Sequence, residues 1–381
     1  MKAYVYTDAS LERYAGRFVW LSINTEDAKN AAFLRQYPIP ALPTLLVLDP
    51  KRDAVTLRYV GGATVPQLRK LLDESEKTYQ AEAKSSADRA LAQGEKLASA
   101  GKQKEAAAAY EKAISASPRS WPSFGRTSES LIFAYSMAND QERCATRALA
   151  LYARVKGTAS AANVASTGLS CAASLDAKHA KRVELLNKLE KATRETFDNP
   201  KIDMSADDRS GLYMSLIEAA DASGDDEQVV RLKTEWSSFL DDVAARATTP
   251  EQRTVYDSHR LTAYLELNTP EKAVTMLEQS ERDFPDDYNP PARLVYAYKA
   301  LKEYDKAIAA SDRALVKVYG PRKIAVYSLR ADVYVAMGDT KAAKETLEQA
   351  IAYAKSLPEG QRSEARIAGL EKRLASMQSG S

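Results

Sequence analysis

Apolar residues follow two different spacings along this chain. Up to about residue 76, short apolar runs rich in β-branched residues alternate with segments of helical spacing; these runs are FVWLSI (18–23), TLLVL (44–48) and AVTLRYV (54–60). Such runs, bounded by turn residues, predict strands of a small α/β unit. From about residue 77 apolar residues recur every three or four positions, interrupted by short turns such as SAGKQ, ELNTPE and AMGDTK. This second pattern predicts a series of helical hairpins.

The change of spacing divides the chain into a small amino-terminal domain, residues 1–76, and a large helical domain, residues 77–381. The helical domain ends in a charged amphipathic segment, EGQRSEARIAGLEKRLASMQ (359–378), which suits a helix that covers the apolar end of a stack. We therefore expect a mostly α-helical protein that begins with a small α/β part.

Small and large residues recur at fixed places within the helical hairpins. Residues 94–118 combine a glycine in the first helix, a glycine at the turn, two alanines flanking an aromatic residue in the second helix, and a final proline: Gly94, Gly101, Ala106, Tyr110, Ala113 and Pro118. Small residues suit positions where two helices approach closely, and larger ones fill the gap between hairpins. This pattern resembles the tetratricopeptide repeat, whose period is about 34 residues.

The equivalent of Ala106 recurs at Ala273, Ala307 and Ala343, and the steps between these last three are 34 and 36 residues. The interval from Ala106 to Ala273 has room for about four further units, and degenerate repeats are expected at 130–152 and 217–236. The resemblance implies an α-solenoid of about seven to eight helical hairpins.

Three prolines lie close together in the loop YPIPALPT (37–44), directly before the predicted strand at 44–48. With a helix expected at 28–37, the strand at 54–60 and the Gly61-Gly62 pair, this region resembles the second part of a thioredoxin-like domain. The resemblance places Pro43 at the family's cis-proline and implies that the backbone of Leu42 pairs with an extended partner, with Thr44 opening the strand. The alternative is a rigid corner without a ligand, stiffened by Pro38 and Pro40.

Thioredoxin-like enzymes carry a Cys-x-x-Cys pair at a helix amino terminus, which lowers the thiolate pKa. This chain has no cysteine before Cys144. The resemblance implies that the cysteine pair and the central strand would precede Met1, so that the domain is incomplete. A longer natural product could supply them, the strands at 18–23 and 44–48 could pair directly, or another chain could add a strand. We favour the first as a hypothesis.

The two cysteines, Cys144 and Cys171, lie 27 residues apart, a spacing that matches no metal or redox motif. Each lies in an alanine-rich helical pattern, so we expect ordinary core thiols rather than a disulfide or a reactive pair. The two histidines, His179 and His259, have no second ligand-type residue at metal-binding spacing. We expect neither a metal site nor a cofactor.

Composition narrows the remaining functions. The 381 residues are 45% hydrophobic, which is enough for a large core. Lys and Arg number 54 against 52 Asp and Glu, and the charges alternate along the chain, which disfavours a nucleic-acid partner.

No apolar run approaches the roughly 18 residues of a membrane span, and the first residues, MKAYVYTDAS, lack a signal-peptide pattern. The compartment stays open: cytoplasmic as the sequence stands, periplasmic or secreted if an upstream signal peptide is missing.

Stacked repeats of this kind form a groove lined by the first helix of each hairpin, which suits a peptide or a partner helix. Carrying the family's groove positions over to this chain gives a mildly acidic, hydroxyl-bearing set: Asp88, Leu91, Glu95, Ser258, Thr262, Asn289, Ala292, Tyr296, Ser328 and Asp332. Tyr296 is the aromatic anchor that we expect to contact a partner; the alternative is that it packs between hairpins.

The sequence therefore predicts a non-enzymatic protein-interaction scaffold with a redox-inactive thioredoxin-like accessory domain and a protein or peptide as partner. The alternative function is that of an enzyme. On that reading the chain is the carboxy-terminal bulk of a thiol-disulfide oxidoreductase whose Cys-x-x-Cys segment lies upstream of Met1.

Overall fold

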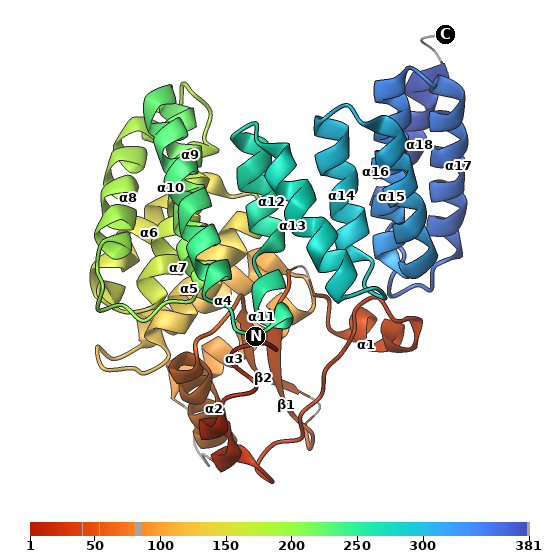
Figure 1. The fold of residues 1–381 in the computed structure, drawn as a ribbon. Helices are drawn as coiled ribbons and strands as arrows, with labels where there is room; N and C mark the ends of the chain where they lie inside the picture. Colours follow the sequence, from red (N-terminus) through yellow and green to blue (C-terminus); the bar gives the residue numbers. More distant parts are fainter. Residues whose placement is uncertain (40, 53, 81–84, 379–381) are drawn as a thin grey trace. The chain divides into compact units, whose positions relative to one another are not determined.

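The computed structural model describes residues 1–39, 41–52, 54–80 and 85–378, and Pro40 of the proline-rich loop lies outside them. The chain is mostly helical (Figure 1) and divides into two compact units. Unit 1 comprises Met1–Arg17 and Pro38–Trp236, and unit 2 comprises Phe18–Tyr37 and Ser237–Ser381.

Unit 1 begins with a short 3-10 helix, η1 (Ala9–Tyr14), and a two-stranded sheet. Strands β1 (Thr44–Asp49) and β2 (Ala54–Val60) pair antiparallel, with Leu45 opposite Tyr59 and an irregularity between Val47 and Leu48. Helix α2 (Val65–Gln80) follows the Gly61-Gly62 pair. The strands predicted at 44–48 and 54–60 are thus confirmed.

The strand predicted at 18–23 is wrong. This segment forms no β pairing, and Val19 and Leu21 are 89% and 75% exposed. A strand persists only where a second strand satisfies its backbone groups, and in the described part of the chain β1 and β2 pair with each other alone. The described residues therefore contain a β-hairpin followed by a helix, and the complete thioredoxin-like sheet is not confirmed.

Helical hairpins make up the rest of unit 1, whose boundary at Trp236 falls within the last helix, and each helix from α3 to α9 packs on the next. Their helices are α3 (Ser86–Ser99), α4 (Gln103–Ala116), α5 (Phe124–Met137), α6 (Gln141–Val155), α7 (Ser160–Ala173), α8 (Arg182–Phe197), α9 (Ala206–Ser223) and α10 (Asp226–Ala245). In the first hairpin, Ala106 and Ala113 are fully buried. A Cβ on Gly94 would lie 2.5 Å from the Tyr110 ring. Small residues therefore mark close helix contacts, as the repeat pattern predicted.

Between the hairpin of Ala106 and the hairpin of Ala273, an interval that the structure describes completely, three hairpins occur instead of the expected four. The reason is their length. Helices α9 and α10 have 18 and 20 residues, against 14 in each of α3 and α4, and the short helix α11 (Pro250–Thr254) is added before the next hairpin. Counting by a fixed period cannot detect such lengthening.

Cys144 on α6 and Cys171 on α7 form a disulfide, with 6.1 Å between their Cα atoms, so the expectation of two free core thiols is wrong. The two helices approach closely because α7 carries Gly168, where a Cβ would lie 2.3 Å from the Cβ of Ala148 on α6. Spacing along the sequence does not reveal this contact.

Unit 2 stacks three hairpins and a final helix in chain order, coloured green to blue in Figure 1. The hairpin helices are α12 (Asp257–Glu266), α13 (Pro270–Asp283), α14 (Asn289–Ala300), α15 (Tyr304–Lys317), α16 (Pro321–Met337) and α17 (Thr340–Ser356). Ala273, Ala307 and Ala343 are fully buried. Helix α18 (Glu364–Gln378) places Ile367 and Leu370 in an apolar cluster with Leu347, so it covers the end of the stack.

Candidate interaction surface

The groove positions predicted in unit 1 are engaged in contacts within the protein. Asp88 lies in the first turn of α3, where it forms a capping box with Ser85 and accepts a hydrogen bond from Trp121 Nε1 at 2.9 Å. Leu91 is buried. These two side chains stabilise the start of the first hairpin.

Glu95 is 0% exposed and lies in a buried polar network. Arg126 Nη1 lies 2.6 Å from its Oε1, and the Tyr110 hydroxyl donates a hydrogen bond to Oε2 at 3.2 Å. Burial raises the pKa of the Glu95 carboxyl, and the positive charge of Arg126 opposes this rise. The side chain is thus held by internal partners.

Strand β2 packs against α3 and supplies a second buried cation, Arg58. The charge of Arg58 acts on Glu95, while its own Nε and Nη2 have no hydrogen-bond partner in the protein. The amino-terminal hairpin of strands therefore contributes to the same buried network as α3 and α5. The sequence gives no signal for this role of Arg58, because the alternating pattern of a strand does not show which helix the strand meets.

A second carboxyl in unit 1, that of the partly buried Glu129, gives a prediction for pH. Glu129 on α5 accepts hydrogen bonds from Asn163 Nδ2, at 3.1 Å, and from Ser160. Burial raises its pKa to about 7, the negative charge of Asp208 adds to the rise and Arg126 opposes it. Since the folded pKa lies above the value of about 4.5 in an unfolded chain, stability is lost as the pH rises from about 4.5 to about 7.

Replacing Glu129 by glutamine is therefore expected to stabilise the protein at pH 8, on the order of 2–3 kcal/mol, and to have little effect at pH 4. The amide cannot ionise, so it avoids the cost of a buried carboxylate. Urea unfolding at the two pH values measures the difference, with Glu105→Gln on the exposed face of α4 as the control. Parallel pH profiles for Glu129→Gln and the native protein would contradict the prediction.

The remaining predicted positions lie in unit 2 on α12, α14 and α16, the first helices of three successive hairpins. Helix α14 packs beside both α12 and α16, so the structure brings the three helices into one row. Their predicted side chains are Ser258 and Thr262 on α12, Asn289, Ala292 and Tyr296 on α14, and Ser328 and Asp332 on α16. We call these seven residues the helix row.

The side chains of the helix row differ in their solvent exposure and in their hydrogen-bond partners within the protein. Tyr296 is 48% exposed, and Thr262 is exposed as well. The hydroxyls of Thr262 and Ser328 donate to main-chain carbonyls one turn earlier, at 3.1 and 3.0 Å. Asn289 Nδ2 donates to Asp287, and Asp332 pairs with Arg373 of α18. Tyr296 is thus the largest open side chain of the row.

Two charged residues beside the helix row were missed by the sequence analysis. Arg293 on α14 is half-buried, and desolvation lowers its pKa while the nearby carboxylates of Asp257 and Asp287 oppose this shift. Asp257 is buried and accepts a hydrogen bond from Ser280 at 2.7 Å. Helical spacing assigns charged residues to solvent, so it gave no signal for the burial of Asp257 or the partial burial of Arg293.

The proline-rich loop in unit 1 forms a corner at the start of β1. The Leu42–Pro43 peptide bond is cis, Leu42 is 57% exposed, and the carbonyl of Pro43 accepts a hydrogen bond from Gly61 N at 2.9 Å. The Thr44 hydroxyl donates to the carbonyl of Ala41 at 2.7 Å. The loop is therefore fastened to the end of β2, and the Leu42 side chain faces solvent.

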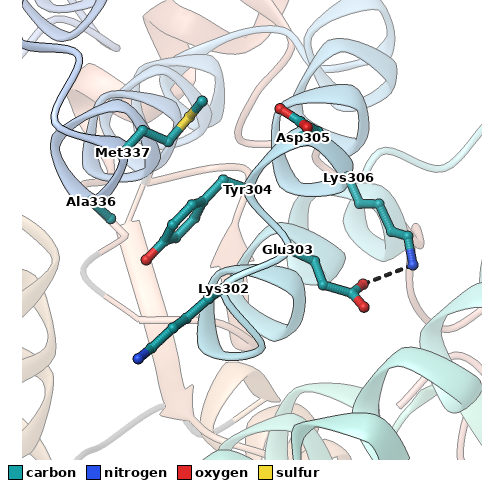
Figure 2. Close-up of a pocket in the computed structure, with 7 residues that line it drawn as sticks. All are labelled: Lys302, Glu303, Tyr304, Asp305, Lys306, Ala336 and Met337. Carbon is teal, nitrogen blue, oxygen red and sulfur yellow. Dashed lines mark ion pairs between the residues drawn. The ribbon is translucent and has the colours of Figure 1, made fainter.

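A surface pocket of about 540 Å³ lies elsewhere on unit 2, at the turn between α14 and α15 and the end of α16 (Figure 2). It is lined by Lys302, Glu303, Tyr304, Asp305, Lys306, Ala336 and Met337. Glu303 and Lys306 form an ion pair at 2.9 Å. The pocket contains no member of the helix row.

Comparison with known proteins agrees with the helical hairpins. A family model of the tetratricopeptide repeat matches residues 324–356, which cover most of α16 and α17. Among curated protein sequences, none matches the chain significantly. The chain contains a tetratricopeptide repeat, and its fold is a solenoid of similar helical hairpins preceded by a two-stranded sheet.

Solved structures of tetratricopeptide-repeat proteins resemble the chain at low sequence identity. A tetratricopeptide repeat protein from Parabacteroides merdae is 10% identical, with a TM-score of 0.47 over 76% of this chain and 99% of its own. The protein TTC0263 of Thermus thermophilus is 17% identical, with a TM-score of 0.26 over 77% and 98%. The TPR2AB-domain:pHSP90 complex of yeast Sti1 is 17% identical, with a TM-score of 0.28 over 76% and 98%.

Proteins built from this repeat are generally scaffolds without enzymatic activity, and this chain has the organisation of that class. In the described residues, no helix combines the length and apolar character needed to cross a membrane. Nor does the described part of the chain bring three or more His, Cys, Asp or Glu side chains together as metal ligands.

Proposed function

We propose that the protein is an interaction scaffold that binds a protein or peptide along the helix row of unit 2. The observation that carries this proposal is the exposure of Tyr296 in the middle of the row. The equivalent positions in unit 1, Asp88 and Glu95, are already bound to Trp121 and Arg126. Among the positions that the repeat predicts for the groove, the open side chains therefore lie on α12 and α14, led by Tyr296.

The chemistry of the row favours an extended segment with an apolar side chain flanked by hydrogen-bonding groups. An exposed tyrosine offers a large contact area at low entropic cost. Ser258 and Thr262 on α12 and Ser328 on α16 add hydroxyl oxygens on the two neighbouring helices, and each oxygen can accept a further hydrogen bond. Asp332 gives the row a mildly acidic end, although Arg373 balances its charge.

Replacing Tyr296 by alanine is expected to weaken partner binding about tenfold or more, since aromatic anchors contribute most of the binding energy in such interfaces. The probes are peptides selected from a random library on the full native chain, and their affinities are compared by fluorescence anisotropy. Tyr79→Ala is the matched control, because Tyr79 is similarly exposed, at 43%, but lies on α2 of unit 1. Equal affinities for the native chain and Tyr296→Ala would remove Tyr296 from the binding site.

Residues 1–76 are, on the same proposal, a redox-inactive accessory domain related to the thioredoxin-like fold. The order β1, turn, β2, Gly61-Gly62 and α2 supports the relationship. The sequence places no cysteine in this region, and the exposed corner at Leu42, Pro43 and Thr44 would then serve as a contact point rather than a catalytic one.

A further inference from the structure

A segment from the amino-terminal part of the sequence lies along one edge of the repeats in unit 2. We call residues 24–36 the strap; they form a turn followed by η2 (Ala28–Asn30) and α1 (Ala31–Gln36), which Figure 1 labels. The strap contacts the loops that precede α16 and α18 and the residue before α14. These loops join each hairpin to the next, so the contacted edge is distinct from the helix row.

Side chains from all three places bind the turn of the strap. Asn24 Nδ2 donates to the Tyr319 hydroxyl at 2.7 Å. The Tyr288 hydroxyl donates to Glu26 at 2.8 Å, and Arg322 Nε lies 3.2 Å from the same carboxylate. Burial raises the pKa of the Tyr288 hydroxyl, and the hydrogen bond to Glu26 and the charge of Glu26 raise it further, so the hydroxyl remains a donor. Glu26 is thus recognised by a donor and a cation at once.

The backbone of the strap is bound as closely as its side chains. Gln361 Nε2 donates to the carbonyl of Thr25 at 3.1 Å. A Cβ on Gly320 would lie 2.2 Å from the carbonyl oxygen of Glu26, and one on Gly360 would lie 1.9 Å from that of Ala31. Two separate loops therefore carry glycine where the strap passes, and any side chain there would displace it.

The strap keeps its shape through its own hydrogen bonds. Asn24 Oδ1 accepts from Glu26 N at 2.9 Å, and Asn30 Nδ2 donates to the carbonyl of Asn24 at 2.8 Å. Asp27 caps η2 by accepting from Lys29 N. A segment that is already folded loses less entropy when it binds.

From these contacts we propose that the edge formed by Tyr288, Tyr319, Gly320, Arg322, Gly360 and Gln361 is a peptide-recognition site for an acidic turn, and that the strap occupies it within the same chain. The edge combines two hydroxyl groups, one cation and two glycine-lined passages. It therefore selects an Asn-x-Glu turn by charge, hydrogen bonding and close backbone approach together.

Hydrogen exchange in the full chain tests whether the strap can leave the edge while the helices α14 to α17 stay folded. Gly360→Ala, whose Cβ would collide with Ala31, is expected to speed amide exchange in residues 24–36 by about tenfold or more, with α14 to α17 unchanged. Gly369→Ala is the matched control, because a Cβ there meets no atom within 4 Å. Unchanged exchange in the strap, or equal acceleration in α14 to α17, would overturn the proposal.

A second experiment tests recognition between molecules. A labelled peptide of residues 22–37 is added to the native chain and to the variant Asn24→Ala/Glu26→Ala, which weakens the strap and leaves the edge intact. The peptide is expected to bind the variant about tenfold more tightly, because the native site is already occupied. A peptide carrying Glu26→Lys should bind neither protein. Equal binding to both proteins, or none to the variant, would refute a recognition site.

Discussion

Replacing Glu95 by alanine is expected to lower the free energy of unfolding by about 3–5 kcal/mol. The substitution removes the nearest partner of Arg126, which lies 2.6 Å away and is only 9% exposed. It also removes the acceptor of the Tyr110 hydroxyl. Arg126 then keeps Glu74, whose Oε2 lies 3.9 Å from its Nε, too far for a hydrogen bond. Most of its desolvation cost is no longer offset, so the loss of stability exceeds what the Glu95–Arg126 pair itself contributes. Urea unfolding measures it.

Two further variants separate this effect from a general effect of removing charge. Glu105→Ala, at an exposed position of α4, is expected to change stability by less than about 0.5 kcal/mol. The double variant Glu95→Met/Arg126→Met should recover part of the loss, because apolar side chains of similar volume tolerate burial, while buried Arg58 still loses the nearby Glu95 charge. If Glu95→Ala unfolds like the native protein, Glu95 is an open groove residue after all.

Reduction of the Cys144–Cys171 disulfide is expected to cost about 3.5 kcal/mol of stability at 25 °C, from the chain entropy regained by the unfolded loop. The disulfide closes a loop with a sequence separation of 27 residues and links α6 to the next helix, α7. The unfolding midpoint should therefore fall on addition of a thiol reductant. Mass spectrometry of the unreduced native protein should show a mass lower by two hydrogens than that of the reduced chain.

The control for reduction is the double variant Cys144→Ala/Cys171→Ala. Both cysteines are buried in alanine-rich surroundings, so alanine fits with little disturbance. This variant should match the reduced native protein in stability and show no response to the reductant. Two titratable thiols in the folded, unreduced protein would show that the bond does not form.

The helices could be predicted because their signal is local. Apolar spacing locates each amphipathic face, and the buried alanines at 106, 273, 307 and 343 occupy the positions that the repeat pattern gave them. The strand at 18–23 failed for the opposite reason. Its residues have high strand propensity, but a strand also requires a second strand at its edge, which local composition does not supply.

The surfaces were less predictable than the helices. The repeat pattern predicts which face of a helix lines the groove. It does not predict which other parts of the chain cover that face. Glu95 and Tyr296 follow from the same rule, yet one is buried beside Arg58 of β2 and the other is open. The contacts of Gly320 and Gly360 with the strap likewise join residues too distant in sequence for any spacing rule.

The position of the strap in the sequence determines when its contacts can form. Asn24 and Tyr319 are separated by 295 residues, and Thr25 and Gln361 by 336. At a synthesis rate of about 5–20 residues per second, a ribosome needs roughly 15–60 s to deliver the loops that hold it. Throughout that interval the strap lacks its final partners and is exposed to chaperones at the ribosome. A nascent chain released before residue 361 would lack part of the loops that bind the strap.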